Sequence, residues 1–269
     1  MRWRIDLAYD GTAFRGWATQ PGHRTVQGVL EGHIAQVLRL PQQPALVVAG
    51  RTDAGVHAAA QVCHVDLAYE EDLAATLLRR LTRVLPDDVV VRGVHAAPPG
   101  FDARFSALWR RYCYRLVDSD HVPDPLQRHR VAPVRHPVDL DLFNQAAELL
   151  RGLRDFAAFC RPRDGATTIR DLREVSASRT ADGVVEVHLL ADAFCHSMVR
   201  SVVGALTAVA GRRRSFDWLA DASASPTRHN EIMVMPARGL TLEEVGYPAD
   251  DELAARAQQA RSVRTLEEP

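Results

Sequence analysis

The chain has 269 residues, 46% hydrophobic and 25% charged, so it is long enough to bury a substantial core as one large domain or two smaller ones. All 33 basic residues are arginines, and a chain without lysine can neither form a Schiff base nor supply a P-loop lysine. Its four cysteines are scattered singly, unlike those of a zinc knuckle or redox dithiol, and no apolar run is long enough to cross a bilayer. We therefore expect a soluble, cytoplasmic protein.

The net charge of -1 hides an uneven distribution of charge. Four arginines and no acid lie between 200 and 214, and seven arginines accompany four acids between 151 and 179. The segment from 249 onward carries five acids and three arginines. Such stretches are commonly solvated surface, yet the guanidinium fork also suits phosphate binding. The pattern is compatible with RNA binding without establishing it.

In the first half of the chain, alternating residues and short apolar runs predict strands, whereas apolar residues at helical spacing predict helices. In chain order, the expected elements are a strand at 3–9, a loop at 10–23, a helix at 26–38 with Thr25 as its N-cap, a strand at 45–49, a loop at 50–58, a strand at 61–67, a helix at 73–85 stopped by Pro86, and a strand at 89–94.

The second half repeats this mixture. The expected elements are a long strand at 107–117, an irregular connection at 119–137, a helix at 140–150, a hairpin of strands at 172–178 and 184–190 around Asp182-Gly183, a helix at 196–210 ended by Gly211, a strand at 240–245, and a terminal helix at 250–264. We therefore expect two α/β halves, 1–106 and 107–248, followed by an acidic tail at 249–269.

The loop at 50–58 holds the densest cluster of unusual residues. Its two glycines bracket Asp53, which stands close to Arg51 directly after an apolar strand. A carboxylate beside a cation stays ionised and can serve as a nucleophile. Two alternatives remain open at this point: a tight turn whose aspartate caps backbone amides, or metal binding by Asp53, His57 and His64, whose spacing matches no helical HExxH pattern.

The run GRTDAGVHA, at 50–58, is similar to the signature of the TruA family of tRNA pseudouridine synthases. Four further blocks resemble blocks of that family in the same order along the chain: YDGTAFRGW from Tyr9, FDARFSALWRRYCYRL at 101–116, FCHSMVRSVVGAL at 194–206 and ARGLTLEEVGYP at 237–248. The chain departs from the family pattern at Ala18, Thr82 and Met235, none of which is the proposed nucleophile.

The resemblance implies a role for each of four residues. Asp53 would attack the target nucleotide at ribose C1′ or base C6, and Tyr112 would pack against the flipped base. Arg200 would pair with Asp53, and Arg51 would fill the gap that the extruded base leaves in the helix. Taken singly, Tyr112 is more typical of a strand core, Arg51 is typical of an exposed loop, and Arg200 of a solvated helix face.

For the whole protein, the resemblance implies an α/β fold with a mixed, largely antiparallel sheet built from two related halves, flanking helices and a central basic cleft. It implies conversion of uridine to pseudouridine at positions 38, 39 and 40 of the tRNA anticodon stem-loop by a homodimer, without cofactor or metal. Further candidate RNA contacts are Arg15, Arg104, Arg111, Arg212 and Arg213. The competing hypotheses are a catalytically silent RNA-binding protein and a metal-dependent hydrolase.

Overall fold

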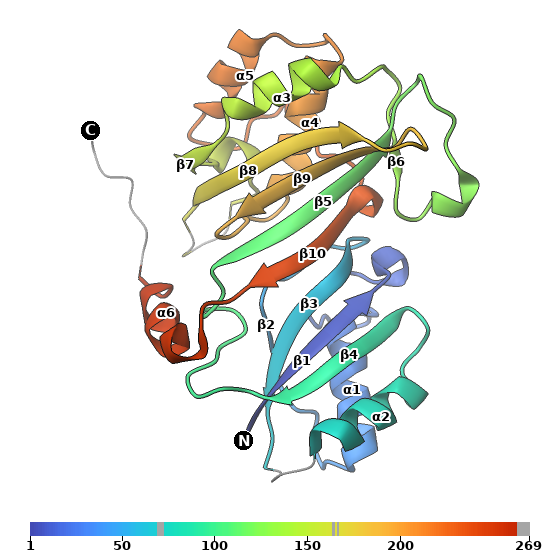
Figure 1. Ribbon diagram of the computed structural model, residues 1–269, viewed down its shortest axis with the longest axis vertical. Coiled ribbons are helices and arrows are strands. Elements are labelled where there is room, and N and C mark those ends of the chain that lie inside the picture. Colours follow the sequence, from blue (N-terminus) through green and yellow to red (C-terminus); the bar gives the residue numbers. More distant parts are fainter. Residues whose placement is uncertain (69–72, 163–164, 166, 263–269) are drawn as a thin grey trace. The chain divides into compact units, whose positions relative to one another are not determined.

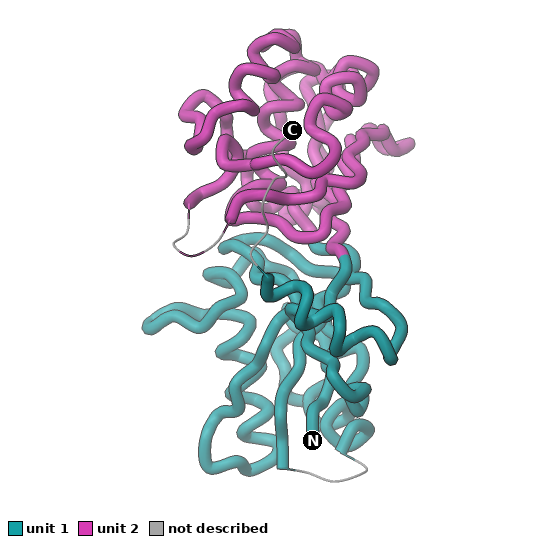
Figure 2. Tube along the Cα trace, turned by 90° about the vertical axis from the view of Figure 1, so that its left-hand side faces the viewer, with its two compact units in different colours: residues 1–108, 242–262 teal, residues 109–241, 263–269 magenta. Residues whose placement is uncertain are grey.

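The computed structural model describes residues 1–68, 73–162, 165 and 167–262. These residues form two compact units, one built from 1–108 and 242–262 and the other from 109–241 (Figure 2). Both units combine strands with helices, as Figure 1 labels them, which confirms the expected α/β class. Residues 263–269 of the expected tail lie outside the described part of the chain.

The first unit is a sheet with helices. In chain order its elements are β1 (Arg2–Tyr9), α1 (Val26–Leu38), β2 (Leu46–Val48), β3 (His57–Asp66), α2 (Leu73–Val84), β4 (Val89–Ala96), β10 (Leu240–Gly246) and α6 (Leu253–Gln259). The strand order is β4-β1-β3-β10, and β2 also pairs with β3. Strand β1 is antiparallel to both β3 and β4, and β2 is antiparallel to β3. Helices α1 and α2 pack against each other, and α2 packs against β4.

The sequence explains how these elements form. Side chains along β1 alternate between half-exposed and buried, as a period of two requires. Helix α1 begins after Thr25, whose hydroxyl accepts a hydrogen bond from the Gly28 N–H at 3.3 Å, so the predicted N-cap is confirmed. The core of the unit is supplied by β1, α1 and α2, and its fully buried members include Ile5, Leu7, Leu30, Ile34, Leu77 and Leu81.

The second unit has its own strands and helices. They are β5 (Trp109–Val117), β6 (Ala132–Pro133), α3 (Leu140–Glu148), β7 (Gly152–Asp155), β8 (Ile169–Arg179), β9 (Val185–Ala191), α4 (Met198–Ala210) and α5 (Phe216–Ser223). The strand order is β5-β9-β8-β7 with antiparallel neighbours, and β6 pairs with β5 in parallel. Helix α3 packs against α4 and β8. The largely antiparallel sheet is thus confirmed.

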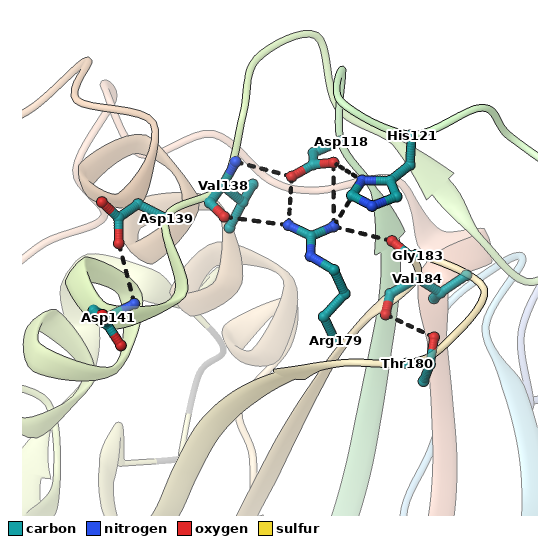
Figure 3. A network of polar contacts seen from close by, with 9 residues as sticks. All are labelled: Asp118, His121, Val138, Asp139, Asp141, Arg179, Thr180, Gly183 and Val184. Carbon is teal, nitrogen blue, oxygen red and sulfur yellow. Dashed lines mark hydrogen bonds and ion pairs between the residues drawn. The ribbon is translucent and has the colours of Figure 1, made fainter.

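A buried carboxylate joins three segments of the second unit (Figure 3). Asp118, directly after β5, is fully buried and accepts hydrogen bonds from Arg179 Nη2 at 2.7 Å and the Val138 N–H at 3.0 Å, and it lies 2.9 Å from His121 Nδ1. Arg179 also donates to the Gly183 carbonyl at 3.0 Å. Burial alone would raise the pKa of Asp118, but the bonds from Arg179, His121 and Val138 outweigh burial and lower it to about 2.

Residues 242–262 distinguish the observed units from the halves expected at 1–106 and 107–248. They return to the first unit, where the Ser106 hydroxyl donates to the Leu253 carbonyl at 3.1 Å. A Cβ added to Gly100, whose φ is +79°, would lie 2.6 Å from the Cβ of Ala254. Helix α6 therefore lies directly on this backbone. The described part of the segment expected as an acidic tail therefore packs against the first unit.

Several element boundaries differ from the sequence prediction. Strand β3 begins at His57 rather than at residue 61, because its pairing with β1 continues as far as Tyr9 opposite Ala58. Helix α5, begun by Ser215 with a bond to the Trp218 N–H at 3.1 Å, and strand β7 were not predicted. Among the described residues, the structure has no helix with both the length and the apolar character to span a membrane.

Candidate active site

Asp53 lies in the loop that links β2 to β3 in the first unit. Its side chain is half-buried, whereas Thr52 before it is 6% exposed and Arg51 is exposed. The loop turns tightly, since the Val56 N–H donates to the Asp53 carbonyl at 3.1 Å and Gly55 adopts a φ of +78°, which favours glycine. The turn alternative raised from the sequence is thus correct for the backbone, and it presents the Asp53 carboxylate at a partly open position.

The opening motif YDGTAFRGW holds this loop in place. The Trp17 N–H donates to the Thr52 carbonyl at 3.0 Å, and the Gly55 N–H donates to the Phe14 carbonyl at 3.2 Å. These two bonds lie on either side of Asp53. Two sequence blocks that were identified separately therefore form one structural assembly within the first unit.

Two glycines of the opening motif allow this close approach. A Cβ added to Gly11 would lie 2.0 Å from the Val56 carbonyl oxygen, a distance no side chain tolerates. Gly16 has a φ of +92°, and its added Cβ would lie 2.9 Å from the Thr52 oxygen. The Gly11 N–H also donates to His57 Nδ1 at 3.0 Å. Glycine is thus required where the two loops touch.

Tyr112 lies in the second unit, in the middle of β5. It stands opposite Leu189 of β9 and is 6% exposed. Its ring meets that of Phe194 edge-on at 5.1 Å between centroids, a favourable aromatic geometry. The central block and the block at 194–206 therefore meet at this tyrosine.

Arg200 lies in the first turn of α4, half-buried. Its Nε donates to the Met235 carbonyl at 2.6 Å, and the Met235 N–H donates to the Arg200 carbonyl at 3.2 Å. One turn later, a Cβ added to Gly204 would lie 2.0 Å from the Met233 carbonyl oxygen, so glycine lets this segment lie against the helix. Because Met235 holds Arg200 through its backbone, the departure from the family pattern at Met235 leaves this contact possible.

Comparisons with known proteins identify the family. A family model described as "tRNA pseudouridine synthase" matches residues 146–248. The tRNA pseudouridine synthase A of Cutibacterium acnes is 63% identical over 98% of this chain and 95% of that protein. This chain belongs to that family of isomerases. Proteins of the same name from Streptomyces avermitilis and Mycobacterium leprae are 52% and 46% identical, over 99% and 98% of this chain and 95% and 96% of their own lengths.

Family membership confirms the resemblance drawn from the five sequence blocks and leaves the residue roles as predictions. Asp53 and Arg51 lie together in one loop of the first unit, whereas Tyr112 and Arg200 belong to the second. The pairing of Asp53 with Arg200 therefore stays a prediction. No role was predicted from the sequence for Tyr9 or Gln61, which are both buried in the first unit. Their burial could not be predicted, because a polar residue in a strand usually faces solvent.

The arginines expected to contact RNA differ in how far their charge is neutralised within the fold. Arg111 pairs with Glu174 at 3.0 Å, and Arg212 pairs with Asp139 at 3.2 Å. Arg104 lies over the Phe105 ring at 4.9 Å. The exposed members without a carboxylate partner among the described residues are Arg15, Arg51 and Arg213. These three are best placed to attract phosphate.

The alternative of a metal centre at Asp53, His57 and His64 finds little support in the geometry. Each histidine accepts a backbone N–H through Nδ1, His57 from Gly11 and His64 from Ala103, both at 3.0 Å. With Nδ1 accepting, the proton of each neutral ring lies on Nε2, so both nitrogens are engaged otherwise than in metal binding.

Another group of possible metal ligands lies in the second unit. Within the described ranges, the ligand atoms of Cys113, Glu186 and His188 lie within 4.8 Å of one another. Glu186, however, is already ion-paired with Arg115 Nε at 2.8 Å, which neutralises the carboxylate. Cys113 is fully buried. The group is better explained as an ion pair on the sheet beside a core thiol.

Proposed function

We propose that this protein isomerises uridine to pseudouridine at positions 38, 39 and 40 in the anticodon stem-loop of tRNAs, with Asp53 as the nucleophile. The observation that carries the proposal is the Asp53 loop itself. Asp53 lies in a turn that the opening motif YDGTAFRGW holds by a hydrogen bond on each side. The chain that carries this turn is similar to tRNA pseudouridine synthase A along nearly its whole length. Such a held loop can aim a nucleophile at one atom.

The reaction needs only the chain's own side chains. Asp53 attacks the nucleotide at ribose C1′ or base C6, and the bond between C1′ and N1 breaks. The uracil turns, a C1′–C5 bond forms, and the bond between the nucleotide and Asp53 breaks, which returns the carboxylate to its starting state. C5 then loses a proton and N1 gains one, so that product and substrate are isomers. Tyr112 packs against the base and exchanges the proton, Arg200 pairs with the Asp53 carboxylate, and Arg51 fills the place of the extruded base. Nothing is oxidised and no group is added, so we propose no cofactor.

The tRNA would be held by arginines whose charge the fold leaves available, Arg15 and Arg213 first, with Arg104, Arg111 and Arg212 as further contacts. Phosphate contacts fix the position of the RNA without reading its bases. We further propose that the protein acts in the cytoplasm. We also propose that it is a homodimer in which each tRNA contacts both subunits.

The test is to incubate the purified protein with unmodified tRNA transcripts and to map pseudouridine chemically. We expect product at positions 38 to 40 and none in a matched transcript that carries cytidine there. Binding without product would support the silent RNA-binding protein instead. Strand cleavage abolished by a chelator would support the metal-dependent hydrolase.

A further inference from the structure

Three buried polar side chains lie next to the Asp53 loop in the first unit. Tyr9 ends β1, Gln61 lies in β3 and Thr52 directly precedes Asp53; they are 5%, 0% and 6% exposed. Burying a hydroxyl or an amide costs free energy unless it is hydrogen-bonded. Apolar side chains of similar size would fill the same space without that requirement. The presence of three polar groups at one point therefore calls for a task that they perform together.

Hydrogen bonds link the three side chains to one another. Gln61 Nε2 donates to the Gly50 carbonyl at 2.8 Å and to Tyr9 Oη at 3.2 Å, which uses both of its hydrogens. Gln61 Oε1 accepts from the Val62 N–H at 3.2 Å. Tyr9 Oη also lies 2.8 Å from Thr52 Oγ1, and either hydroxyl can be the donor of this bond. Burial raises the pKa of Tyr9 to about 12, so its hydroxyl stays protonated at neutral pH.

This series of hydrogen bonds ends at residues of the loop that carries Asp53. The Gly50 carbonyl marks the start of the loop, and Thr52 is the residue before Asp53. The Trp17 N–H holds the Thr52 carbonyl at 3.0 Å, so both the side chain and the backbone of Thr52 are fixed. We propose that Gln61, Tyr9 and Thr52 are positioning residues that hold Asp53 in its reactive orientation. This inference rests on the proposed role of Asp53 as the nucleophile.

The test removes one hydroxyl at a time while keeping the shape of the side chain. Tyr9→Phe and Thr52→Val should each lower the single-turnover rate about tenfold to a hundredfold, because a misplacement of about 1 Å can cost about 10²-fold. Affinity for tRNA should stay unchanged, because neither buried side chain reaches the surface. The measurement is pseudouridine formation at saturating enzyme, with tRNA binding measured separately.

Tyr247→Phe is the matched control. The Tyr247 hydroxyl donates to the Ala103 carbonyl at 2.7 Å in the same unit, so this variant also removes a hydrogen-bonded tyrosine hydroxyl. It should lose thermal stability much as Tyr9→Phe does, yet keep the wild-type rate. If both variants lose rate in proportion to stability, Tyr9 has a structural role only and the proposal is overturned.

Two further variants test whether the effect passes through the bond between Tyr9 and Thr52. Thr52→Ser keeps the hydroxyl and should restore most of the rate that Thr52→Val loses. The double variant Tyr9→Phe with Thr52→Val should be no slower than the slower single variant, because both changes break the same bond between Tyr9 and Thr52. If the rate losses of the two single variants multiply in the double variant, the two side chains act independently, which would contradict a role for the bond between them.

Asp53→Asn separates this inference from the proposed function. If that variant stays active, the nucleophile assignment fails, and the positioning role fails with it. If Asp53→Asn is inactive while Tyr9→Phe and Thr52→Val react at the wild-type rate, only the positioning role is overturned.

Discussion

Two aspartates, Asp118 and Asp53, each follow a strand but lie in different surroundings. Asp118 follows β5 and is fully buried, with Arg179 and the Val138 N–H bonded to its oxygens (Figure 3). Asp53 follows β2 and stays half-buried. The polar groups of Gln61 and Trp17 hold the backbone before it, at Gly50 and Thr52.

The two carboxylates differ in exposure, since Asp118 is buried and Asp53 is half-buried. The donors around Asp118 neutralise its carboxylate, and they lower its pKa by more than burial raises it. Next to Asp53, donors from Gln61 and Trp17 fix the backbone of the loop at Gly50 and Thr52. A carboxylate of the first kind supplies stability, and one of the second kind can supply chemistry. Mutations should therefore separate activity from stability at these two sites.

The largest effect is expected for Asp53→Asn. The amide keeps the shape of the side chain but cannot act as an anionic nucleophile, so the turnover rate should fall by at least about a thousandfold. Binding of tRNA and the melting temperature should hardly change. Product mapping, a binding titration and thermal unfolding measure the three quantities. More than marginal activity in the purified variant would contradict the assignment.

Asp118→Ala should show the opposite pattern. Arg179 would be left without its buried carboxylate, which typically costs about 3–5 kcal/mol in unfolding free energy. Glu174→Ala, which breaks the more exposed pair with Arg111, is the control and should cost about 1 kcal/mol or less. Denaturant unfolding measures both. Equal losses in the two variants would contradict the difference drawn between buried and exposed pairs.

The same pair predicts an acid response. Asp118 has a folded-state pKa of about 2, below its ordinary value of 3.8. A lowered pKa stabilises the fold at pH values above the unfolded-state value, and this stabilisation is lost as the pH falls toward 2. Wild-type protein should therefore lose more unfolding free energy between about pH 4 and pH 2 than Asp118→Ala does.

Neighbouring tyrosines of β5 extend the comparison. The Tyr114 hydroxyl donates to the Pro236 carbonyl at 2.8 Å, whereas the Tyr112 ring lies against Phe194. If Tyr112 exchanges a proton, Tyr112→Phe should lower the single-turnover rate about a hundredfold or more while tRNA binding persists. Tyr114→Phe should cost stability with a much smaller loss of rate. A wild-type rate in Tyr112→Phe would leave Tyr112 with packing or stacking only.

The smallest effect concerns two adjacent arginines. Arg212 is paired with Asp139, whereas Arg213 has no ion-pair partner in the part of the chain that the structure describes. If Arg213 contacts a phosphate, Arg213→Ala should make the log–log slope of tRNA affinity against salt shallower by about one. Arg212→Ala should change the slope less, and the double variant should be the shallowest. A slope unchanged in all three variants would mean that both are solvated surface.

Local signals in the sequence predicted much of the fold. Thr25 before an apolar helical face predicted α1, and Asp182-Gly183 between two apolar runs predicted the β8–β9 hairpin, where Gly183 has a φ of +84°. Both signals lie within a few residues of what they specify. The start of β3 at His57 could not be read in this way, because its partner Tyr9 is remote in the chain.

The residues of the candidate site also divide into those that local sequence predicts and those that only the folded structure reveals. Motif identity pointed to Asp53, Tyr112 and Arg200, since each lies inside a block similar to the family. What holds Asp53 was not readable, because Gln61 looks like any polar strand residue until the fold shows it fully buried. The arginines also looked alike until their carboxylate neighbours were known. Charge available for binding is a property of the folded surface.

The discontinuity of the first unit has a consequence for its synthesis on the ribosome. Residues 1–108 emerge first but lack β10, the neighbour of β3, and α6, which covers Gly100. Residues 109–241 are made while these pieces are still missing. The unit that carries Asp53 is therefore completed late, although most of it is made first. A nascent chain released at 241 would leave β3 without its β10 neighbour, and an unpaired strand edge of this kind is prone to aggregation.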